Sequence, residues 1–569
     1  MSWRELHVRP VPTHALQESD PIVAKVLAAR GVCDERERDL SLAALAPLSQ
    51  LNGLQEAVAL FNRHRDARII IVGDFDADGA TSTALLLRGL AALGFADVGF
   101  IVPNRFEFGY GLSPEIVDVA LQQSPALIVT VDNGISSVAG VARARAAGVD
   151  VIITDHHLAP QTLPAANVIV NPNAPDDPYP SKHLAGVGVA FAVLAALARQ
   201  ASQEQAALAR LPASLLDLVA LGTVADVVAL DHNNRILVEA GLQRIRAGRC
   251  VPGIAALLEV GGRDRRRIVA ADLGFAVGPR LNAAGRMEDM SIGIRCLTTD
   301  DPVEARELAT ALDAINRERR SVEDDMQRQA LVLLDALDEQ SLNDDRLCVC
   351  LYEPDWHQGV VGLVASRIKE RIHRPVFAFA REQPDALVLK GSGRSIPGVH
   401  LRDVLAEVNR RHPDMITRFG GHAMAAGLSL PEAALASFTD AVEAAVRTMC
   451  APSALTPSLD IDGELDAARL SLLFAERLRA QGPWGQRFEE PVFAGLFCVD
   501  SARVVGDQHL KLSLTTSTQP IDAIAFNQIE PRVPVAGELL EVVYRLDINE
   551  WRGRQSVQLM VVQWRFATQ

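Results

Sequence analysis

Three short apolar runs, each followed at once by acidic residues, constrain the fold of this chain more than any other feature. The runs are residues 69–72, 127–131 and 151–154, and they lead into Asp74, Asp132 and Asp155. Continuous runs rich in Val and Ile are typical of strands that are buried on both faces of a parallel sheet. Open α/β sheets bind their ligands beyond the carboxyl ends of such strands. We therefore expect the acidic residues to meet at one edge of a sheet.

The acidic residues at this edge indicate a site for divalent cations. Carboxylates that crowd into one crevice repel one another and resist ionisation unless cations neutralise them. Adjacent imidazoles beside carboxylates favour Mn²⁺ or a similar ion over Ca²⁺. The residues that we single out on these grounds are Asp74, Asp76, Asp78, Asp132, Asp155, His156, His157 and Asp226. The chain is therefore expected to be a metal-dependent enzyme.

The first acidic segment has a regular spacing. Asp74, Asp76 and Asp78 alternate with other residues, so an extended backbone would aim all three carboxylates the same way. We expect a helix to follow from Gly79, with N-terminal amides that could face phosphate oxygens. An acidic loop with a helix cap is the alternative for this segment, and an ordinary turn is the alternative for the Asp-Asn-Gly that begins at Asp132.

Length and composition bound the class of protein. A chain of 569 residues with 49% apolar and 22% charged residues is expected to form three or four globular domains. It contains no apolar run long enough to span a bilayer and no signal-peptide pattern at its start, so we expect a cytoplasmic protein with no membrane contact. The 7 cysteines include no CxxC pair, which argues against disulfides and a zinc ribbon. A net charge of -15 argues mildly against a protein that simply coats nucleic acid.

The order of predicted elements divides the chain. Residues 1–50 are expected to form small helices, and residues 51–300 an α/β domain in which strands alternate with helices. A long, heavily charged helical pattern at 301–342 is typical of a solvent-exposed connector. A second, smaller α/β domain is predicted at 343–452. Alternating strands at 453–569 favour a small barrel of the OB-fold type that binds nucleic acid.

The motifs resemble those of a known superfamily. Asp74-Phe-Asp-Ala-Asp-Gly79, Val131-Asp-Asn-Gly134 and Asp155-His-His157, in this order, are similar to the motifs of the DHH phosphoesterases. The segment Phe419–Gly427 resembles the glycine-rich signature of the associated DHHA1 domain. The blocks Pro103–Gly111 and Gly278–Arg286 are similar to those of the bacterial single-strand-specific exonucleases of this superfamily. The resemblance covers about residues 50–569 and includes the predicted barrel.

This resemblance implies roles for the acidic residues. Members of the superfamily bind two Mn²⁺ or Mg²⁺ ions, and a metal-bound hydroxide attacks phosphorus. Asp132 would bridge the ions, because its strand lies between the other ligands, and Asp74, Asp76, Asp78, His156 and Asp226 would complete the two shells. His157 would contact the scissile phosphate or act as an acid, and Asp155 would orient a neighbouring histidine.

The resemblance also implies phosphate contacts from both sides of a cleft. The candidates are Arg105, Tyr110, Arg280, Asn282, Ser392, Arg394 and His422. For Arg280 and Arg394, salt bridges between domains remain the alternative.

The expected activity is a metal-dependent 5′ to 3′ exonuclease that degrades single-stranded DNA to 5′ mononucleotides in repair and recombination. The expected partners are single-stranded DNA, a single-strand-binding protein and a helicase. The alternatives are an oligonucleotide or cyclic-dinucleotide phosphodiesterase, an inorganic pyrophosphatase and a non-catalytic replication scaffold. The first two have no need of a barrel after residue 455, and a scaffold has no reason to keep mutually repelling carboxylates.

Overall fold

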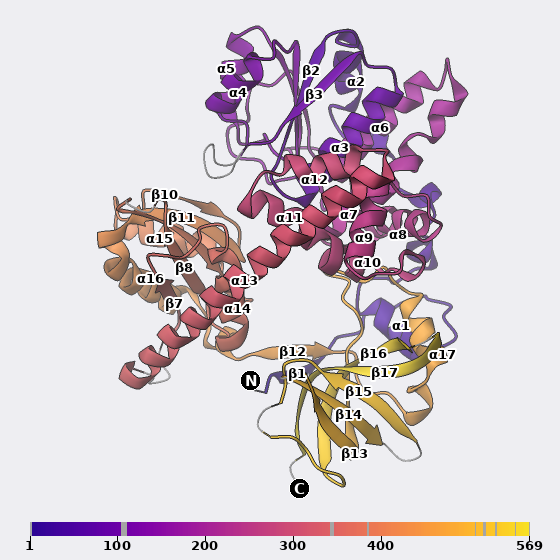
Figure 1. Cartoon of the computed structure of the whole chain (residues 1–569), viewed down its shortest axis with the longest axis vertical. Helices are drawn as coiled ribbons and strands as arrows, with labels where there is room; N and C mark the ends of the chain where they lie inside the picture. Colours follow the sequence, from indigo (N-terminus) through magenta and orange to yellow (C-terminus); the bar gives the residue numbers. More distant parts are fainter. Residues whose placement is uncertain are drawn as a thin grey trace.

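The computed structural model describes residues 3–103, 111–341, 346–383, 386–506, 508–515, 519–529, 532–551 and 553–567, with only the backbone of residues 333–341 and 551. The first α/β domain, the second α/β domain and the barrel are separate bodies in Figure 1, and the long helix α13 runs from the first domain to the second. The predicted fold class is confirmed. The predicted domain boundaries stay predictions.

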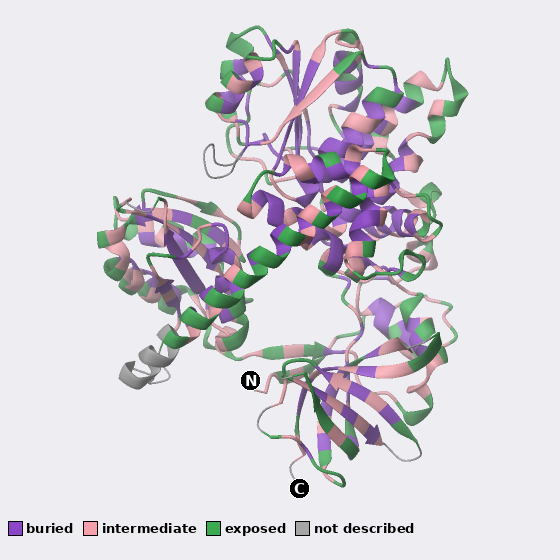
Figure 2. Ribbon diagram, viewed as in Figure 1, coloured by how far each residue is buried: buried purple, intermediate pink, exposed green. Residues whose placement is uncertain are grey.

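The described part of the first α/β domain contains a five-stranded sheet in the order β3-β2-β4-β5-β6, and all of its neighbouring strands are parallel. Its strands are β2 (Arg68–Gly73), β3 (Asp97–Ile101), β4 (Leu127–Val131), β5 (Asp150–Thr154) and β6 (Val168–Val170). The three apolar runs of the sequence therefore form β2, β4 and β5, which are the three inner strands of this sheet. Figure 2 shows these strands buried.

Helices cover both faces of this sheet, which explains why the runs are apolar without alternation. Ile69 and Ile71 pack against one set of helices, and Ile70 and Val72 pack against the other. The first set is α2 (Leu54–Arg63), α3 (Ala77–Ala92) and α6 (Gly186–Ala201), and the second is α4 (Pro114–Leu121) and α5 (Val138–Ala146).

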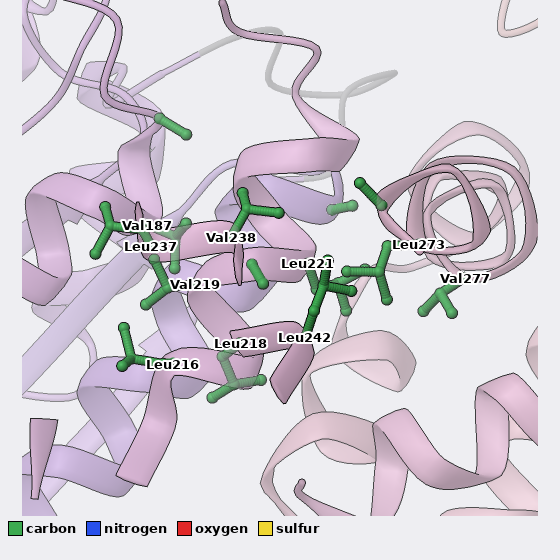
Figure 3. Packing of buried hydrophobic residues seen from close by; sticks show 14 of the residues in the cluster. Val187, Leu216, Leu218, Val219, Leu221, Leu237, Val238, Leu242, Leu273 and Val277 are labelled. Carbon is green, nitrogen blue, oxygen red and sulfur yellow. The ribbon is translucent and has the colours of Figure 1, made fainter. Parts of the chain in front are cut away.

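A helical layer follows the sheet and supports its functional edge. It contains α7 (Leu216–Ala225), α8 (His232–Arg246), α9 (Pro252–Val260), α10 (Ala270–Asp272), a π-helical turn at Leu273–Val277, α11 (Gly278–Met287) and α12 (Ser291–Thr298). Figure 3 shows Leu218 and Leu221 of α7 close to Leu242 of α8 and to Leu273. This apolar packing fixes the end of α7, where Asp226 stands as the C-cap residue.

The helix α13 (Pro302–Ser341) is less exposed than the sequence predicts. Its first half packs on the first domain through Ala305, Ala309 and Leu312, which are all 0% exposed. Its second half packs on the second domain through Met326 and Ala330. The expectation of a solvent-exposed connector is wrong for this face, because each half carries an apolar stripe that its own domain covers.

The second α/β domain has a mixed sheet in the order β10-β11-β9-β8-β7 over its described residues. The strands are β7 (Val349–Tyr352), β8 (Val376–Arg381), β9 (Val388–Arg394), β10 (Arg418–Gly421) and β11 (Ala425–Pro431). The helix α14 (Val361–Ile372) lies between this sheet and α13, and α15 (Leu401–Arg411) and α16 (Leu435–Met449) cover the other face.

The C-terminal domain is the predicted barrel. Its strands β13 (Phe493–Val505), β14 (His509–Thr515), β15 (Pro520–Ala525), β16 (Leu539–Trp551) and β17 (Arg554–Phe566) form a closed barrel, with β15 and β17 parallel. Before it come β12 (Ser458–Ile461) and α17 (Leu472–Arg479). Among the aromatic residues of this domain, which could stack on bases, Phe488, Phe493 and Trp564 are core residues, and Phe526 is 50% exposed.

The N-terminal segment joins the barrel to the first domain. It contains α1 (Pro21–Ala28), three 3₁₀ turns and the strand β1 (Glu5–Val8), which pairs in parallel with β12. Arg30 and Asp462 form an ion pair at 2.6 Å with side chains that are 1% and 2% exposed. The sequence predicts only helices here, because an isolated four-residue strand gains its stability from a partner more than 450 residues away.

Among the helices that the structure describes, none combines the length and the apolar character that a membrane crossing needs.

Candidate metal centre

The acidic strand ends meet at one edge of the parallel sheet. Asp74 follows β2, Asp132 follows β4 and Asp155 follows β5, and these strands are direct neighbours. Three groups of side chains each have potential ligand atoms that lie within 4.8 Å of one another. The groups are Asp74, Asp76 and Asp132; Asp78, His156 and Asp226; and Asp132, His156 and His157. Asp132 and His156 each belong to two groups, so the three groups form one continuous cluster.

The segment after β2 is a turn and a helix start, not an extended chain. The helix α3 begins at Ala77, and the Asp76 carboxylate caps it by accepting a hydrogen bond of 2.9 Å from the Gly79 N–H. Asp78 lies in the first turn, where its carboxylate accepts hydrogen bonds of 2.6 and 2.9 Å from the N–H groups of Gly186 and Val187. The prediction of an extended segment is therefore wrong, because an Asp that caps a helix satisfies N–H groups that an extended chain would leave exposed.

Asp132 occupies a strained position at the centre of the cluster. The backbone of Asp132 is left-handed, with φ of 61°, and the residue is 2% exposed. The N-terminus of α6 lies directly against it, since a Cβ added to Gly186 would stand 2.6 Å from the Cβ of Asp132. Left-handed backbone at a non-glycine residue persists only where the surrounding structure holds it, and such residues gather at functional sites.

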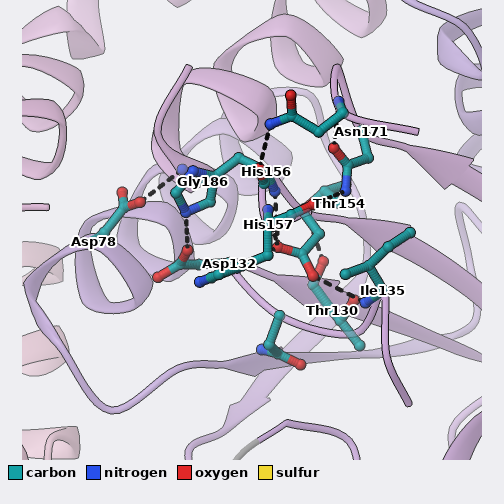
Figure 4. Close-up of polar contacts among 12 residues, drawn as sticks. Asp78, Thr130, Asp132, Ile135, Thr154, His156, His157, Asn171 and Gly186 are labelled. Carbon is teal, nitrogen blue, oxygen red and sulfur yellow. Dashed lines mark hydrogen bonds and ion pairs between the residues drawn. The ribbon is translucent and has the colours of Figure 1, made fainter. Parts of the chain in front are cut away.

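The two histidines after β5 have different surroundings (Figure 4). His156 Nε2 lies 3.0 Å from an oxygen of Asp132 and 3.5 Å from one of Asp226. His157 Nδ1 lies 2.7 Å from Asp155 Oδ1. The Asp155 carboxylate also accepts hydrogen bonds from the backbone N–H groups of Ile135, His156 and His157. Asp155 therefore fixes the loop and orients His157, whereas His156 faces the carboxylate cluster.

Burial and mutual repulsion disfavour charge on the central carboxylates. Burial first, then the neighbouring Asp76, raises the pKa of Asp78 to about 7. The pKa values of Asp132 and Asp226 lie well above the ordinary value for the same two reasons, burial and the adjacent aspartates. Raised pKa values are expected for carboxylates that a metal ion normally neutralises.

The pKa values of the two histidines shift in opposite directions. Burial, and then the charge of His157, lowers the pKa of His156 to about 4, so its imidazole is neutral and able to bind a metal. Burial opposes charge on His157, but the hydrogen bond and charge of Asp155 raise its pKa. Burial also opposes charge on Asp155, yet its contacts with His157 lower the pKa of that carboxyl. His157 and Asp155 thus form an ion pair beside the cluster.

The residues present fit a divalent cation site. Carboxylate oxygens with one neutral imidazole are the donor set that suits Mn²⁺ and Mg²⁺. The buried atoms His156 Nε2 and Asp226 Oδ2 make no hydrogen bond with any described residue. Buried polar atoms are normally hydrogen-bonded. These two atoms are not, and they lie 3.5 Å apart, so they indicate a place for a bound ion.

We expect divalent ions to stabilise the folded chain more at high pH than at low pH. Carboxyls whose folded pKa is raised stabilise the fold when protonated, and this contribution is lost as pH rises from about 4, the unfolded pKa, to about 7, the folded pKa of Asp78. Bound ions offset that loss, because they bind the ionised form. Thermal unfolding in EDTA and in Mn²⁺, at about pH 5 and about pH 7.5, measures this effect. An equal gain in Tm at both pH values would contradict it.

Three residues that hold the site together were not predicted from the sequence. The Asn133 side chain donates hydrogen bonds to the backbone oxygens of Val72 and Val131 and so ties β2 to β4 at the site. Asn171 and Asn173 donate to the backbone oxygens of His157 and His156. A signal existed for the last two, because Asn171-Pro-Asn173 follows the apolar run Val168–Val170 as the acidic motifs follow theirs.

The phosphate candidates of the first domain fall into two kinds. Arg105 and Tyr110 lie outside the described residues. Arg280 is 9% exposed, and its guanidinium pairs at 2.8 Å with Asp313 in the first half of α13, so its salt bridge joins α11 to the connecting helix and does not cross to the second domain. The Asn282 side-chain oxygen accepts a hydrogen bond of 2.7 Å from the Ala77 N–H. Contacts of these residues with phosphate stay predictions.

The candidates of the second domain lie on β9 and beside β10. The Arg394 guanidinium donates a hydrogen bond of 2.9 Å to the Ser392 hydroxyl, and both side chains lie over the start of α14, close to Gly362. His422 follows β10. Burial, and then the charge of His157 in the first domain, lowers the pKa of His422. His422 is thus near enough to the metal cluster to interact with it electrostatically from the opposite domain.

Comparisons with known proteins agree with this architecture. Three family models match the chain: the DHH family, N-terminal domain, at residues 68–223; the DHHA1 domain at 344–448; and the RecJ OB domain at 461–563. Fold and site together define a DHH-type phosphoesterase. The single-stranded-DNA-specific exonucleases RecJ of Salmonella typhimurium and Escherichia coli are 51% and 50% identical to the chain over 551 and 556 residues. These matches cover 95% and 96% of the chain, and the same shares of the two relatives. The chain belongs to the RecJ family.

A solved structure supports the same arrangement of domains. RecJ of Thermus thermophilus in complex with Mn²⁺ matches with a TM-score of 0.81 and 32% identity, over 99% of this chain and 80% of that one. The same protein in complex with Mg²⁺ matches with a TM-score of 0.75.

Proposed function

We propose that this chain is a metal-dependent exonuclease that degrades single-stranded DNA from the 5′ end to 5′ mononucleotides, in DNA repair and recombination. The observation that carries the proposal is the cluster of Asp74, Asp76, Asp78, Asp132, Asp226 and His156 at the sheet edge, in a chain of the RecJ family. A buried carboxylate cluster of this kind suits two-metal phosphodiester hydrolysis.

These six residues would hold two divalent ions, Mn²⁺ or Mg²⁺, with Asp132 between them. The bound ions supply a hydroxide nucleophile at neutral pH and stabilise the charge that develops on phosphate. Asp132 suits the bridging position, because it belongs to two of the three ligand groups and lies at the end of a central strand.

His157 would contact the scissile phosphate. The Asp155 carboxylate at 2.7 Å favours the protonated imidazole. An imidazolium has no lone pair for a metal but attracts an anionic phosphate and can donate a proton to the leaving oxygen. Asp155 acts through His157 by fixing its ring and its charge.

The strand would pass between the two α/β domains. Ser392 and Arg394 of β9 would face this strand of DNA, since their side chains lie beside the start of α14, where helix N–H groups favour phosphate. His422 would add a donor near the metal centre, and Arg105, Tyr110, Arg280 and Asn282 are the candidates from the first domain. We assign the region after residue 453 to binding the strand beyond the active site, with the exposed Phe526, which packs edge-on against His509, as a base-stacking residue.

We propose two further partners, a helicase and a single-strand-binding protein. A nuclease that acts only on single strands needs a helicase to separate the duplex and a binding protein to keep the separated strand accessible. We place the activity in the cytoplasm, where bacterial DNA lies.

The test is a time course on 5′-labelled and 3′-labelled oligonucleotides, single-stranded and blunt duplex, with Mn²⁺, Mg²⁺ or EDTA. We expect labelled mononucleotide at the earliest times from the 5′-labelled single strand alone, and no product in EDTA. Early mononucleotide from the 3′ label, or equal cleavage of the duplex, would contradict the proposal. A Phe526→Ala variant in the same assay should slow the degradation of long strands and leave that of dinucleotides unchanged.

A further inference from the structure

The helix α11 packs directly on the turn that carries Asp74, Asp76 and Asp78. A Cβ at Gly285 of α11 would collide with the carbonyl oxygen of Phe75, so the helix and the backbone of the turn are in contact there. One turn of helix earlier, the side-chain oxygen of Asn282 accepts a hydrogen bond of 2.7 Å from the Ala77 N–H. Asn282 is 205 positions from Ala77 in the sequence, and the two contacts hold consecutive parts of the same turn.

The hydrogen bond to Ala77 completes the capping of α3. The first N–H groups of a helix have no acceptor within the helix. In α3 the Asp76 carboxylate accepts from Gly79, and Asn282 supplies the acceptor for Ala77. Ala77 lies between Asp76 and Asp78 in the chain, so the group that Asn282 holds is the backbone between two site carboxylates.

We propose that Asn282 is a positioning residue, which holds the first turn of α3 so that Asp76 and Asp78 face the metal centre together. The proposal rests on the proposed function for the role of these two carboxylates. When they are ionised, Asp76, Asp78, Asp132 and Asp226 repel one another, and the hydrogen bond between Asn282 and the Ala77 N–H holds the turn against that repulsion. A small rotation of this turn would move both carboxylates at once, which is why one hydrogen bond at Ala77 has a large effect.

Two variants separate this role from a contact with substrate phosphate. Asn282→Ala removes the acceptor, and Asn282→Asp keeps an acceptor for Ala77 and adds a negative charge. A positioning role predicts that Asn282→Ala weakens Mn²⁺ binding by about 10- to 100-fold and that Asn282→Asp restores it. A phosphate contact predicts the reverse order, with a higher KM for DNA in the Asp variant than in the Ala variant, because a carboxylate repels phosphate.

The measurements are a calorimetric titration of the full-length protein with Mn²⁺ and nuclease kinetics at several Mn²⁺ concentrations. We expect Asn282→Ala to regain much of its kcat at high Mn²⁺ with an unchanged KM for DNA. Calorimetry needs no catalytic activity, so it tests the positioning role even if the proposed nuclease function fails. Thermal unfolding of each variant shows that the chain is folded.

The matched control is Asn62→Ala, which removes the α2 side chain that donates a hydrogen bond of 2.8 Å to Gln200 of α6, and it should bind Mn²⁺ as the unmodified chain does. Wild-type Mn²⁺ affinity in a folded Asn282→Ala variant would overturn the proposal. So would an Asp variant that is more impaired than the Ala variant in DNA binding while metal binding stays normal in both.

Discussion

Asp132→Ala is expected to lower turnover by about 10³-fold or more, because it removes the carboxylate that we propose as the bridge between the two metal ions. Asp132 ends the central strand β4 and lies within ligand distance of Asp74 and Asp76 on one side and of His156 and His157 on the other. Its loss would leave each ion with an incomplete shell. Initial rates on a 5′-labelled single strand at saturating Mn²⁺ measure the effect.

The fold should survive this change. Removing a carboxylate whose pKa burial and neighbouring aspartates raise relieves repulsion and leaves the apolar core intact. We expect the Tm in EDTA to be equal to or above that of the unmodified chain. Asp264→Ala is the matched control, since Asp264 is paired with Arg266 on the surface, and it should keep full activity. Activity near that of the unmodified chain in Asp132→Ala at saturating Mn²⁺ would refute the bridging role.

The convergence of the acidic residues could be predicted because each acidic motif can be recognised from local sequence alone. Each acidic motif directly follows an apolar run, and parallel strands bring their carboxyl ends to one edge whatever their order in the sheet. The convergence of Asp74, Asp132 and Asp155 therefore needed no knowledge of tertiary contacts. The barrel is predictable for a similar reason, since its strands are contiguous in sequence and alternate regularly.

What the sequence could not predict depends on partners that are distant along the chain. The period-two spacing of Asp74, Asp76 and Asp78 favours an extended chain. Two distant groups favour a helix start instead, because Asn282 accepts a hydrogen bond from the Ala77 N–H and the N-terminus of α6 donates one to Asp78. The ion pair of Arg280 with Asp313 of α13 could not be read from the sequence, because the two residues are brought together only by the packing of α11 on α13. The strand β1 has no partner until β12 is in place. In each case local propensity competes with a tertiary contact, and the contact decides.

The two adjacent histidines should have separable effects on metal binding. His156 faces Asp132 and Asp226, and its pKa is lowered to about 4, so its neutral imidazole suits the role of metal ligand that we propose for it. His157 pairs with Asp155, which raises its pKa and favours the protonated imidazole, and we propose that this imidazole contacts phosphate. We therefore expect His156→Ala to weaken Mn²⁺ binding by at least about tenfold. His157→Ala should leave two ions bound and lower kcat by about 10² to 10⁴-fold, the usual contribution of a general acid.

Calorimetric titration with Mn²⁺ and single-turnover kinetics on a 5′-labelled strand distinguish the two variants. In His156→Ala the activity should depend on Mn²⁺ concentration and recover in part at high concentration, because the defect is in affinity. In His157→Ala no concentration of Mn²⁺ should restore the rate, because the missing group acts on the substrate. The exposed His412 provides the control, and His412→Ala should behave as the unmodified chain. Loss of one ion in both histidine variants would refute the division, since it would make His157 a metal ligand and leave Asp155 as the residue that orients it toward the metal.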